Sequence, residues 1–167
     1  KLKVDDPMLM ETDVGPLVNE DQVEQIEEQV NDAIKKGARI LTGGKRLDRK
    51  GFFYTPTVLT DVKSSMKVAK EEVFGPVAPV IVANDEKEAV EIANSSEYGL
   101  GASIWTKNEN KALKIARKIE AGCVFINSVV KSDPRMPFGG VKKSGIGREL
   151  SKYGLKEFVN VKGINVY

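Results

Sequence analysis

The chain has 167 residues, of which 41% are hydrophobic and 30% charged, a composition typical of a globular protein with one ordinary core. The formal net charge is only +2, so no strong field is present to attract nucleic acid or an anionic membrane. The chain has no histidine and one cysteine, Cys123, which excludes an internal disulfide, a Ser-His or Cys-His catalytic device and a His-ligated metal site within it.

The beginning of the chain and its apolar runs bear on location. The first residues, KLKVDDPML, have no signal-peptide pattern, and the longest apolar runs are far too short to cross a bilayer. A single cysteine also fits a reducing compartment. We therefore expect a cytoplasmic protein with no nucleic-acid or membrane partner. We expect no metal either, because Asp5, Asp6 and Asp13 are too sparse for a metal site.

The first half of the chain predicts one amphipathic helix followed by two short strands. Asn19 is suited to cap the helix, and Gly37 to end it. An apolar stripe at helical spacing comprises Val23, Ile26, Val30, Ala33 and Ile34. Residues 39–41 predict a short strand, and residues 52–59 a second one, at an edge or a bulge because of Pro56.

The second half alternates between strands and helices. Apolar runs at 77–83, 101–106 and 123–127 predict strands, while Asp85 and Asn108 are suited to cap a helix in each of the two intervals. Strand, helix, strand, helix, strand with short links is typical of a parallel sheet. The sequence therefore predicts an α/β fold. Ligands in such sheets bind beyond the carboxyl ends of the strands, where the loop after residue 127 lies.

Residues 70–76 bring a carboxylate close to an aromatic side chain, just before a predicted strand. Glu72 could accept two hydrogen bonds from a sugar diol, and Phe74 could pack on a flat heterocycle. A solvated glutamate and a core phenylalanine before a Gly-Pro turn would give the same pattern. The residues alone favour this plainer, structural interpretation.

Residues 127–140 form a long loop, and long loops in compact domains are often functional. Within it, Arg135 could bind a carboxylate through two parallel hydrogen bonds, and Ser132 could add another. Phe138 follows in the same loop. An ordinary surface loop is an equally good interpretation at this point.

Two other features are predicted to be structural. The glycines of residues 139–147 fit neither a P-loop nor a dinucleotide fingerprint, so we expect tight turns that Arg148 and Glu149 tie down. Cys123 begins the apolar run Cys-Val-Phe-Ile, which predicts a small core residue rather than an exposed reactive thiol.

Taken in order, short segments along the whole chain resemble the aldehyde dehydrogenase family. The most specific are Glu-Glu-x-Phe-Gly-Pro at 71–76, Pro-Phe-Gly-Gly at 137–140 and Ser-Gly-x-Gly-Arg-Glu at 144–149. The others are Gly15-Pro16-Leu17, Gly37-Ala38, Gly43-Gly44, Gly51-Phe52-Phe53, Pro56-Thr57-Val58, Ala93-Asn94, Tyr98-Gly99-Leu100 and the stretch 122–127. The resemblance implies the parallel-sheet part of that family's catalytic domain over 1–150, and an oligomerisation strand segment over 151–167.

The resemblance also implies a reaction. In this family a cysteine thiolate attacks the aldehyde, hydride passes to NAD or NADP, and a glutamate-activated water hydrolyses the thioester. That cysteine and glutamate lie before the point where this chain begins, and Cys123 falls where the family has a small strand residue. We therefore expect no catalytic residue here and an inactive isolated chain. It could be an engineered piece, a proteolytic remnant or part of a longer gene product.

Site residues follow from the same resemblance. Glu72 matches the glutamate that binds the nicotinamide ribose, and Phe74 matches the aromatic beside the nicotinamide. Phe138 matches a residue of the aldehyde tunnel. Ser132 falls where succinic semialdehyde dehydrogenases have a serine that binds the substrate's far carboxylate, and Arg135 is a second candidate for that contact, or a structural residue. The residues that select NAD or NADP precede residue 1 in the family.

The last ten residues carry an expectation about assembly. Residues 158–167 alternate enough to predict a strand and resemble the family's oligomerisation strand, which implies a homo-oligomer. Asn160 replaces an acidic residue that braces the dimer interface in some members. A second hypothesis follows from the missing nucleophile: the chain is a non-catalytic assembly module that pairs with itself through this strand.

Overall fold

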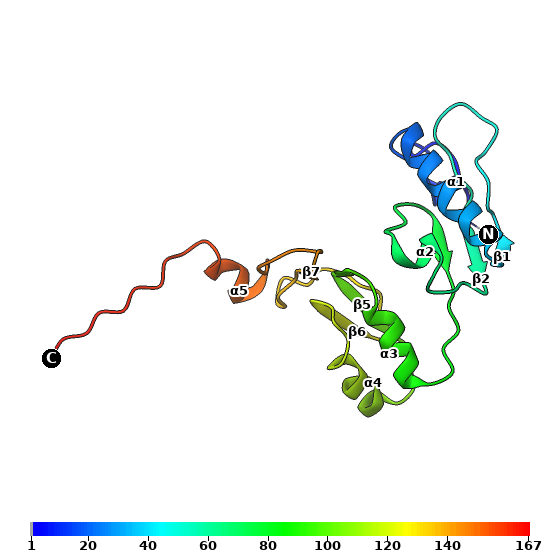
Figure 1. Cartoon of the computed structure of the whole chain (residues 1–167). Coiled ribbons are helices and arrows are strands. Elements are labelled where there is room, and N and C mark those ends of the chain that lie inside the picture. Colours follow the sequence, from blue (N-terminus) through cyan, green and yellow to red (C-terminus); the bar gives the residue numbers. More distant parts are fainter. Residues whose placement is uncertain (1) are drawn as a thin grey trace. The chain divides into compact units, whose positions relative to one another are not determined.

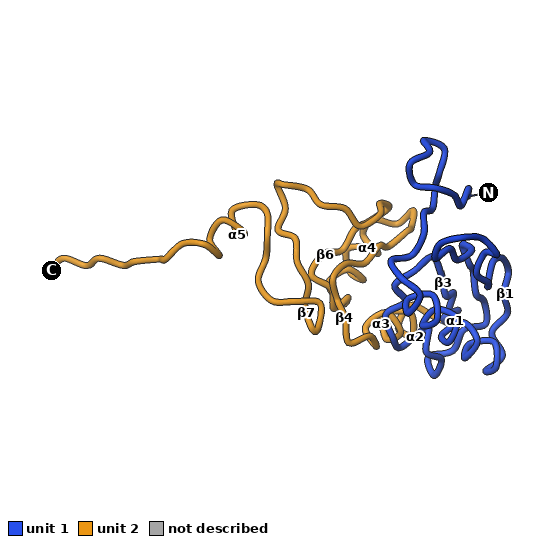
Figure 2. The backbone as a smooth tube through the Cα atoms, turned by 90° about the horizontal axis from the view of Figure 1, so that it is seen from above, with its two compact units in different colours: residues 1–84 blue, residues 85–167 orange. Residues whose placement is uncertain are grey.

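A computed structural model describes residues 2–167. It divides into two compact units, the first ending at Asn84 and the second running from Asp85 to Tyr167 (Figure 2). Helices and short strands alternate in both units (Figure 1), which confirms the predicted α/β class. The predicted boundary at residue 150 separates the catalytic-domain part from the oligomerisation segment. The division into compact units does not test it, so it stays a prediction.

The long helix α1 (Glu20–Lys35) forms as its local signals predict. The Asn19 side chain accepts a hydrogen bond of 2.9 Å from the backbone N–H of Gln22. At the other end Gly37 has a φ of 100°, and two bonds close a Schellman motif: Gly37 N–H to Ile34 O at 3.0 Å, and Ala38 N–H to Ala33 O at 2.9 Å. Asn19 and Gly37 therefore bound the helix as predicted.

One face of α1 is the centre of the first unit's core. The buried cluster comprises Val23, Ile26, Val30, Ala33, Ala38, Tyr54, Leu59, Val62, Met66 and Val68. Four of the five residues of the predicted stripe are among them. Ile34, the fifth, is 40% exposed.

A three-stranded sheet completes the first unit. The strand β1 (Arg39–Thr42) runs antiparallel to β2 (Thr57–Thr60), and β2 runs parallel to β3 (Val77–Pro79). The short helix α2 (Lys67–Lys70) lies between β2 and β3 in sequence, and the Asp32 carboxylate of α1 accepts from its Lys67 N–H at 2.9 Å. Pro56 lies just before β2 rather than within it, which corrects the predicted 52–59 strand.

The second unit contains a β-α-β arrangement. The strand β5 (Gly101–Ile104) pairs in parallel with β6 (Cys123–Ile126), and α4 (Glu109–Ala116) connects them. The helix α3 (Glu86–Asn94) precedes this pair, and β4 (Tyr98–Gly99) pairs antiparallel with β7 (Val141–Lys142). Both predicted caps are confirmed: Asp85 accepts from Glu88 N–H at 2.8 Å, and Asn108 accepts from Lys111 N–H at 2.9 Å.

The predicted single parallel sheet of three strands is corrected by the pairing of β3. Its partner is β2 of the first unit, with Thr57 N–H donating to Pro76 O and Val80 N–H donating to Leu59 O, both at 2.8 Å. Only β5 and β6 pair as expected. An apolar run indicates a strand but does not identify its neighbour, and the crossover through α2 determines the partner here.

The chain ends in α5 (Ser151–Lys156) and an extended tail (Figure 1). The predicted strand over 158–167 is not formed, because a strand requires a hydrogen-bonded neighbour and no other described segment pairs with this one. Its large apolar side chains Phe158, Val159, Val161, Ile164 and Val166 are exposed.

Two absences hold for residues 2–167. No helix there is long and apolar enough to span a membrane. No group of three or more His, Cys, Asp or Glu side chains lies close enough together there to hold a metal ion.

Candidate functional site

The loop between α2 and β3 presents two of the predicted site residues to the surface. Glu72 is exposed, and Phe74 is 68% exposed, so it is not the core residue that the plainer interpretation required. Two tight turns shape the backbone, one around Phe74, with Gly75 N–H donating to Val73 O at 2.9 Å, and one after it, with Val77 N–H donating to Gly75 O at 2.8 Å. The loop therefore offers a carboxylate and an aromatic face two residues apart.

Helix α1 packs against this loop and donates hydrogen bonds to it. The Gln29 side-chain amide donates to the Glu71 carboxylate and to the Glu72 backbone carbonyl, both at 3.2 Å. Further along, Gly75 lies so close to α1 that an added Cβ would be 2.1 Å from the Ile26 Cδ1 methyl. Glycine at position 75 therefore allows the loop to approach the helix.

A small pocket of about 390 Å³ adjoins Phe74. It is lined by Pro16, Leu17, Val18, Gln22, Val73, Phe74 and Gly75. The Gln22 side-chain nitrogen is buried and has no hydrogen-bond partner among residues 2–167. Neither Gln22 nor Gln29 is predicted from the sequence, where the signal of each is an uncharged polar residue close to the apolar stripe.

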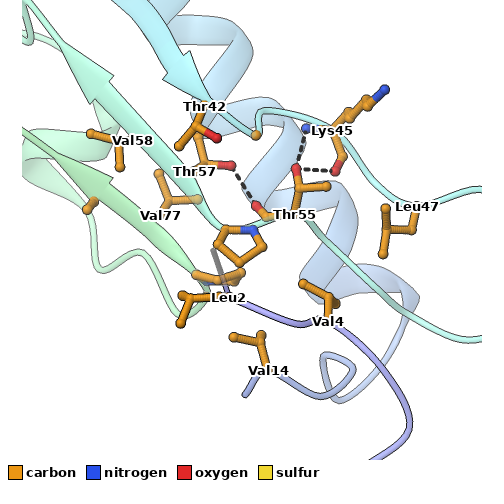
Figure 3. A pocket seen from close by; sticks show the side chains of 15 residues that line it. Leu2, Val4, Val14, Thr42, Lys45, Leu47, Thr55, Thr57, Val58 and Val77 are labelled. Atoms are coloured by element: carbon orange, nitrogen blue, oxygen red, sulfur yellow. Dashed lines mark hydrogen bonds between the residues drawn. The ribbon is translucent and has the colours of Figure 1, made fainter. Parts of the chain in front are cut away.

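A larger pocket of about 890 Å³ lies elsewhere in the first unit (Figure 3) and contains none of the predicted site residues. Its labelled side chains are mostly aliphatic, including Leu2, Val4 and Val14. Two hydroxyls at its wall are already engaged, since Thr55 donates to Lys45 O at 2.8 Å and Thr57 donates to Thr55 O at 2.7 Å. This pocket therefore offers mainly apolar contact.

In the second unit, the loop at 127–140 contains a short ion pair. Two nitrogens of the Arg135 guanidinium donate to the two oxygens of Asp133 at 2.9 and 2.6 Å, and the Arg135 backbone N–H adds a third bond at 2.9 Å. These hydrogen bonds hold the pKa of the Asp133 carboxyl well below its usual range and raise the pKa of Arg135. The Arg135 side chain remains 85% exposed.

The other two residues of this loop are placed differently. Ser132 is exposed, whereas Phe138 is half-buried and is fixed by backbone bonds to Glu149 in both directions, at 2.9 and 2.8 Å. Phe138 lines a pocket of about 400 Å³ with residues from 139–149, and Ser132 is not among the lining residues. The structure therefore does not bring the two into one pocket.

The glycine-rich segment forms tight turns, as predicted, with positive φ at Gly139, Gly145 and Gly147. The Arg148 guanidinium donates to the carbonyls of Gly140 and Gly147, which ties the two turns together. The residue before β6 approaches this segment so closely that a Cβ on Gly122 would be 1.7 Å from the Gly139 carbonyl oxygen. Cys123, half-buried in β6, directs its Sγ to the Pro137 carbonyl at 3.6 Å, which fits a packing role.

Comparison with known proteins identifies the family. The sequence profile of the aldehyde dehydrogenase family matches residues 1–164. The chain belongs to the aldehyde dehydrogenase family. Among curated relatives, it is 52% identical over 163 residues to succinate-semialdehyde dehydrogenase [NADP(+)] 1 of Mycobacterium tuberculosis. It is 49% identical to a probable succinate-semialdehyde dehydrogenase [NADP(+)] of Synechocystis. Each match covers 98% of this chain and 36% of the relative, so the chain spans about a third of their length.

Solved structures agree with this assignment. The betaine aldehyde dehydrogenase of Staphylococcus aureus in complex with NAD+ superposes with a TM-score of 0.87 at 40% identity, over 94% of this chain and 32% of that one. The structure of Gox0499, a protein that selects a cofactor and a substrate, superposes with a TM-score of 0.94 at 42% identity, over 100% of this chain and 37% of that one. The fold is therefore that of part of an aldehyde dehydrogenase.

Proposed function

We propose that this chain is the C-terminal part of a nicotinamide-dependent aldehyde dehydrogenase that oxidises succinic semialdehyde to succinate in the cytoplasm. The observation that carries the proposal is the match of 98% of the chain to succinate-semialdehyde dehydrogenases at about half identity. The nucleophilic cysteine and the base belong to the rest of the whole protein. The isolated chain is therefore inert towards aldehydes.

In this proposal the α2–β3 loop binds the cofactor. Bound NAD or NADP would accept the hydride. The exposed Glu72 carboxylate accepts hydrogen bonds from the two hydroxyls of the nicotinamide ribose, and Phe74 packs beside the nicotinamide ring. The geometry of the loop supports both roles, because each side chain is exposed and the backbone between them is fixed by turns and by α1. The named relatives support NADP, and the NAD+ complex supports NAD.

The loop at 127–140 would contact the aldehyde. Ser132 donates to the far carboxylate of the substrate, and Phe138 contacts its hydrocarbon part. A polar contact is needed there because an unpaired carboxylate is costly to bury. Arg135 is the second candidate for the carboxylate, but it would first have to exchange its bonds to Asp133. We therefore assign the primary contact to Ser132.

The experiment is a comparison of substrates in the whole protein. The ratio of kcat/KM for succinic semialdehyde over propanal should be high and should fall at least about tenfold in Ser132→Phe, because one charge-assisted hydrogen bond is lost. Ser64→Phe makes the same change at an exposed serine in the first unit and should leave the ratio unaltered. An unchanged ratio in Ser132→Phe would remove the carboxylate role.

The exposed apolar tail favours a second candidate. Residues 158–167 carry alternating apolar side chains and have no strand partner among the described residues. We propose that this segment pairs with another subunit in a homo-oligomer. In the alternative function this self-association is the chain's sole activity, and it acts as a non-catalytic assembly module.

A further inference from the structure

Gln29 is an unusual residue for its position in α1. It is 1% exposed and lies on the buried face of the helix, beside Val30. Gln29 is one of two buried polar side chains among the residues that the structure describes. An apolar side chain of the same size would fill this place without the cost of desolvating an amide. The buried amide therefore needs an explanation beyond packing.

The hydrogen bonds of Gln29 all run to one loop. Its side-chain nitrogen donates to the Glu71 carboxylate and to the Glu72 carbonyl, and its Oε1 has no partner within residues 2–167. Turning the amide over would set Oε1 against two acceptors, so the chemistry of the neighbours fixes the nitrogen toward the loop. The amide thus clamps the backbone at Glu72 itself.

We propose that Gln29 is a positioning residue that sets cofactor affinity by fixing the direction of Glu72 and Phe74. This inference rests on the proposed function of that loop. The Glu72 side chain is exposed and no hydrogen bond or ion pair of its own within residues 2–167 holds it, so the backbone alone sets the direction in which it leaves the loop. The Gln29 bond fixes that backbone, and the contact between Gly75 and Ile26 fixes the far end of the loop. Phe74 lies between the two anchors.

The test replaces Gln29 with methionine, which keeps the volume and removes the donor. In the whole protein, Gln29→Met should raise the KM for NAD(P)+ about fivefold or more and change kcat at saturating cofactor less than about twofold. Val30→Ala is the matched control, because it disturbs the same core at the next residue but breaks no bond to the loop. A KM in Gln29→Met no higher than in Val30→Ala would overturn the inference.

If the whole protein does not oxidise aldehydes, that result contradicts the proposed function but not the positioning role of Gln29. A second measurement then tests the positioning role by itself. Amide hydrogen exchange over residues 71–75 can be followed in the 167-residue chain itself. Exchange there should be faster in Gln29→Met than in Val30→Ala at equal global stability. Equal exchange in the two variants would show that Gln29 does not fix the loop.

Discussion

At the residue scale, close backbone approaches place the sharpest demands on the sequence. Gly122 precedes β6, and any Cβ there would be 1.7 Å from the Gly139 carbonyl oxygen, a backbone atom that cannot rotate away. Gly122→Ala should therefore destabilise the chain by roughly 3 kcal/mol or more, the cost of overpacking against rigid structure. Urea unfolding measures it. Gly163→Ala, with no atom within 4 Å, should be neutral, and equal stability of the two variants would contradict the packing.

The Asp133–Arg135 pair gives a prediction about pH. The hydrogen bonds from Arg135 lower the pKa of Asp133 below its ordinary 3.8. A depressed folded-state pKa means that the pair's contribution is present above 3.8 and is lost as pH falls through the lower folded value. Carboxyl-carbon NMR should therefore show Asp133 still ionised at pH 3.8, and Arg135→Gln should return its pKa towards that value. A titration at the ordinary pKa in the unsubstituted chain would show that Arg135 is free to bind a substrate carboxylate.

At the element scale, local signals were predictable, whereas strand partners were predicted correctly only for β5 and β6. The caps Asn19, Asp85 and Asn108 were predicted correctly because each bonds to a backbone N–H only three residues away. The partner of β3 was not predicted correctly, because its pairing with β2 depends on the path of the chain through α2. Gln29 was missed because its partners are 42 and 43 residues away in sequence, beyond any periodic pattern.

The tail is the element whose structure depends most on a partner. Its alternation predicts a strand, but a strand needs a neighbour, and exposed apolar strands tend to pair with another chain. Light scattering should find the 167-residue chain self-associated, and a version ending at Glu157 should form assemblies of fewer chains. Because Val161→Lys adds a charge within the segment, it should weaken association in the same way. A monodisperse monomer of the unaltered chain would leave the assembly role without support.

At the scale of the whole molecule, the candidate groups fall into two sets. Glu72 and Phe74 lie in the first unit, and Ser132, Arg135 and Phe138 lie in the second. The family resemblance assigned these roles from motifs, and the structure adds their exposure, their supports and the engagement of Arg135. Their roles in binding stay predictions, because each describes contact with a molecule rather than with the chain.

In the proposed function, these residues bind cofactor and aldehyde, and the reactive thiol belongs to another part of the whole protein. Cys123 is the only thiol here, and its place in β6 indicates packing. The direct test is aldehyde-dependent reduction of NAD(P)+ by the whole protein carrying Cys123→Ala. The account predicts a kcat within about threefold of the unsubstituted protein, since only a packing group is lost. A fall of several orders of magnitude in a folded variant would make Cys123 the nucleophile and contradict the account.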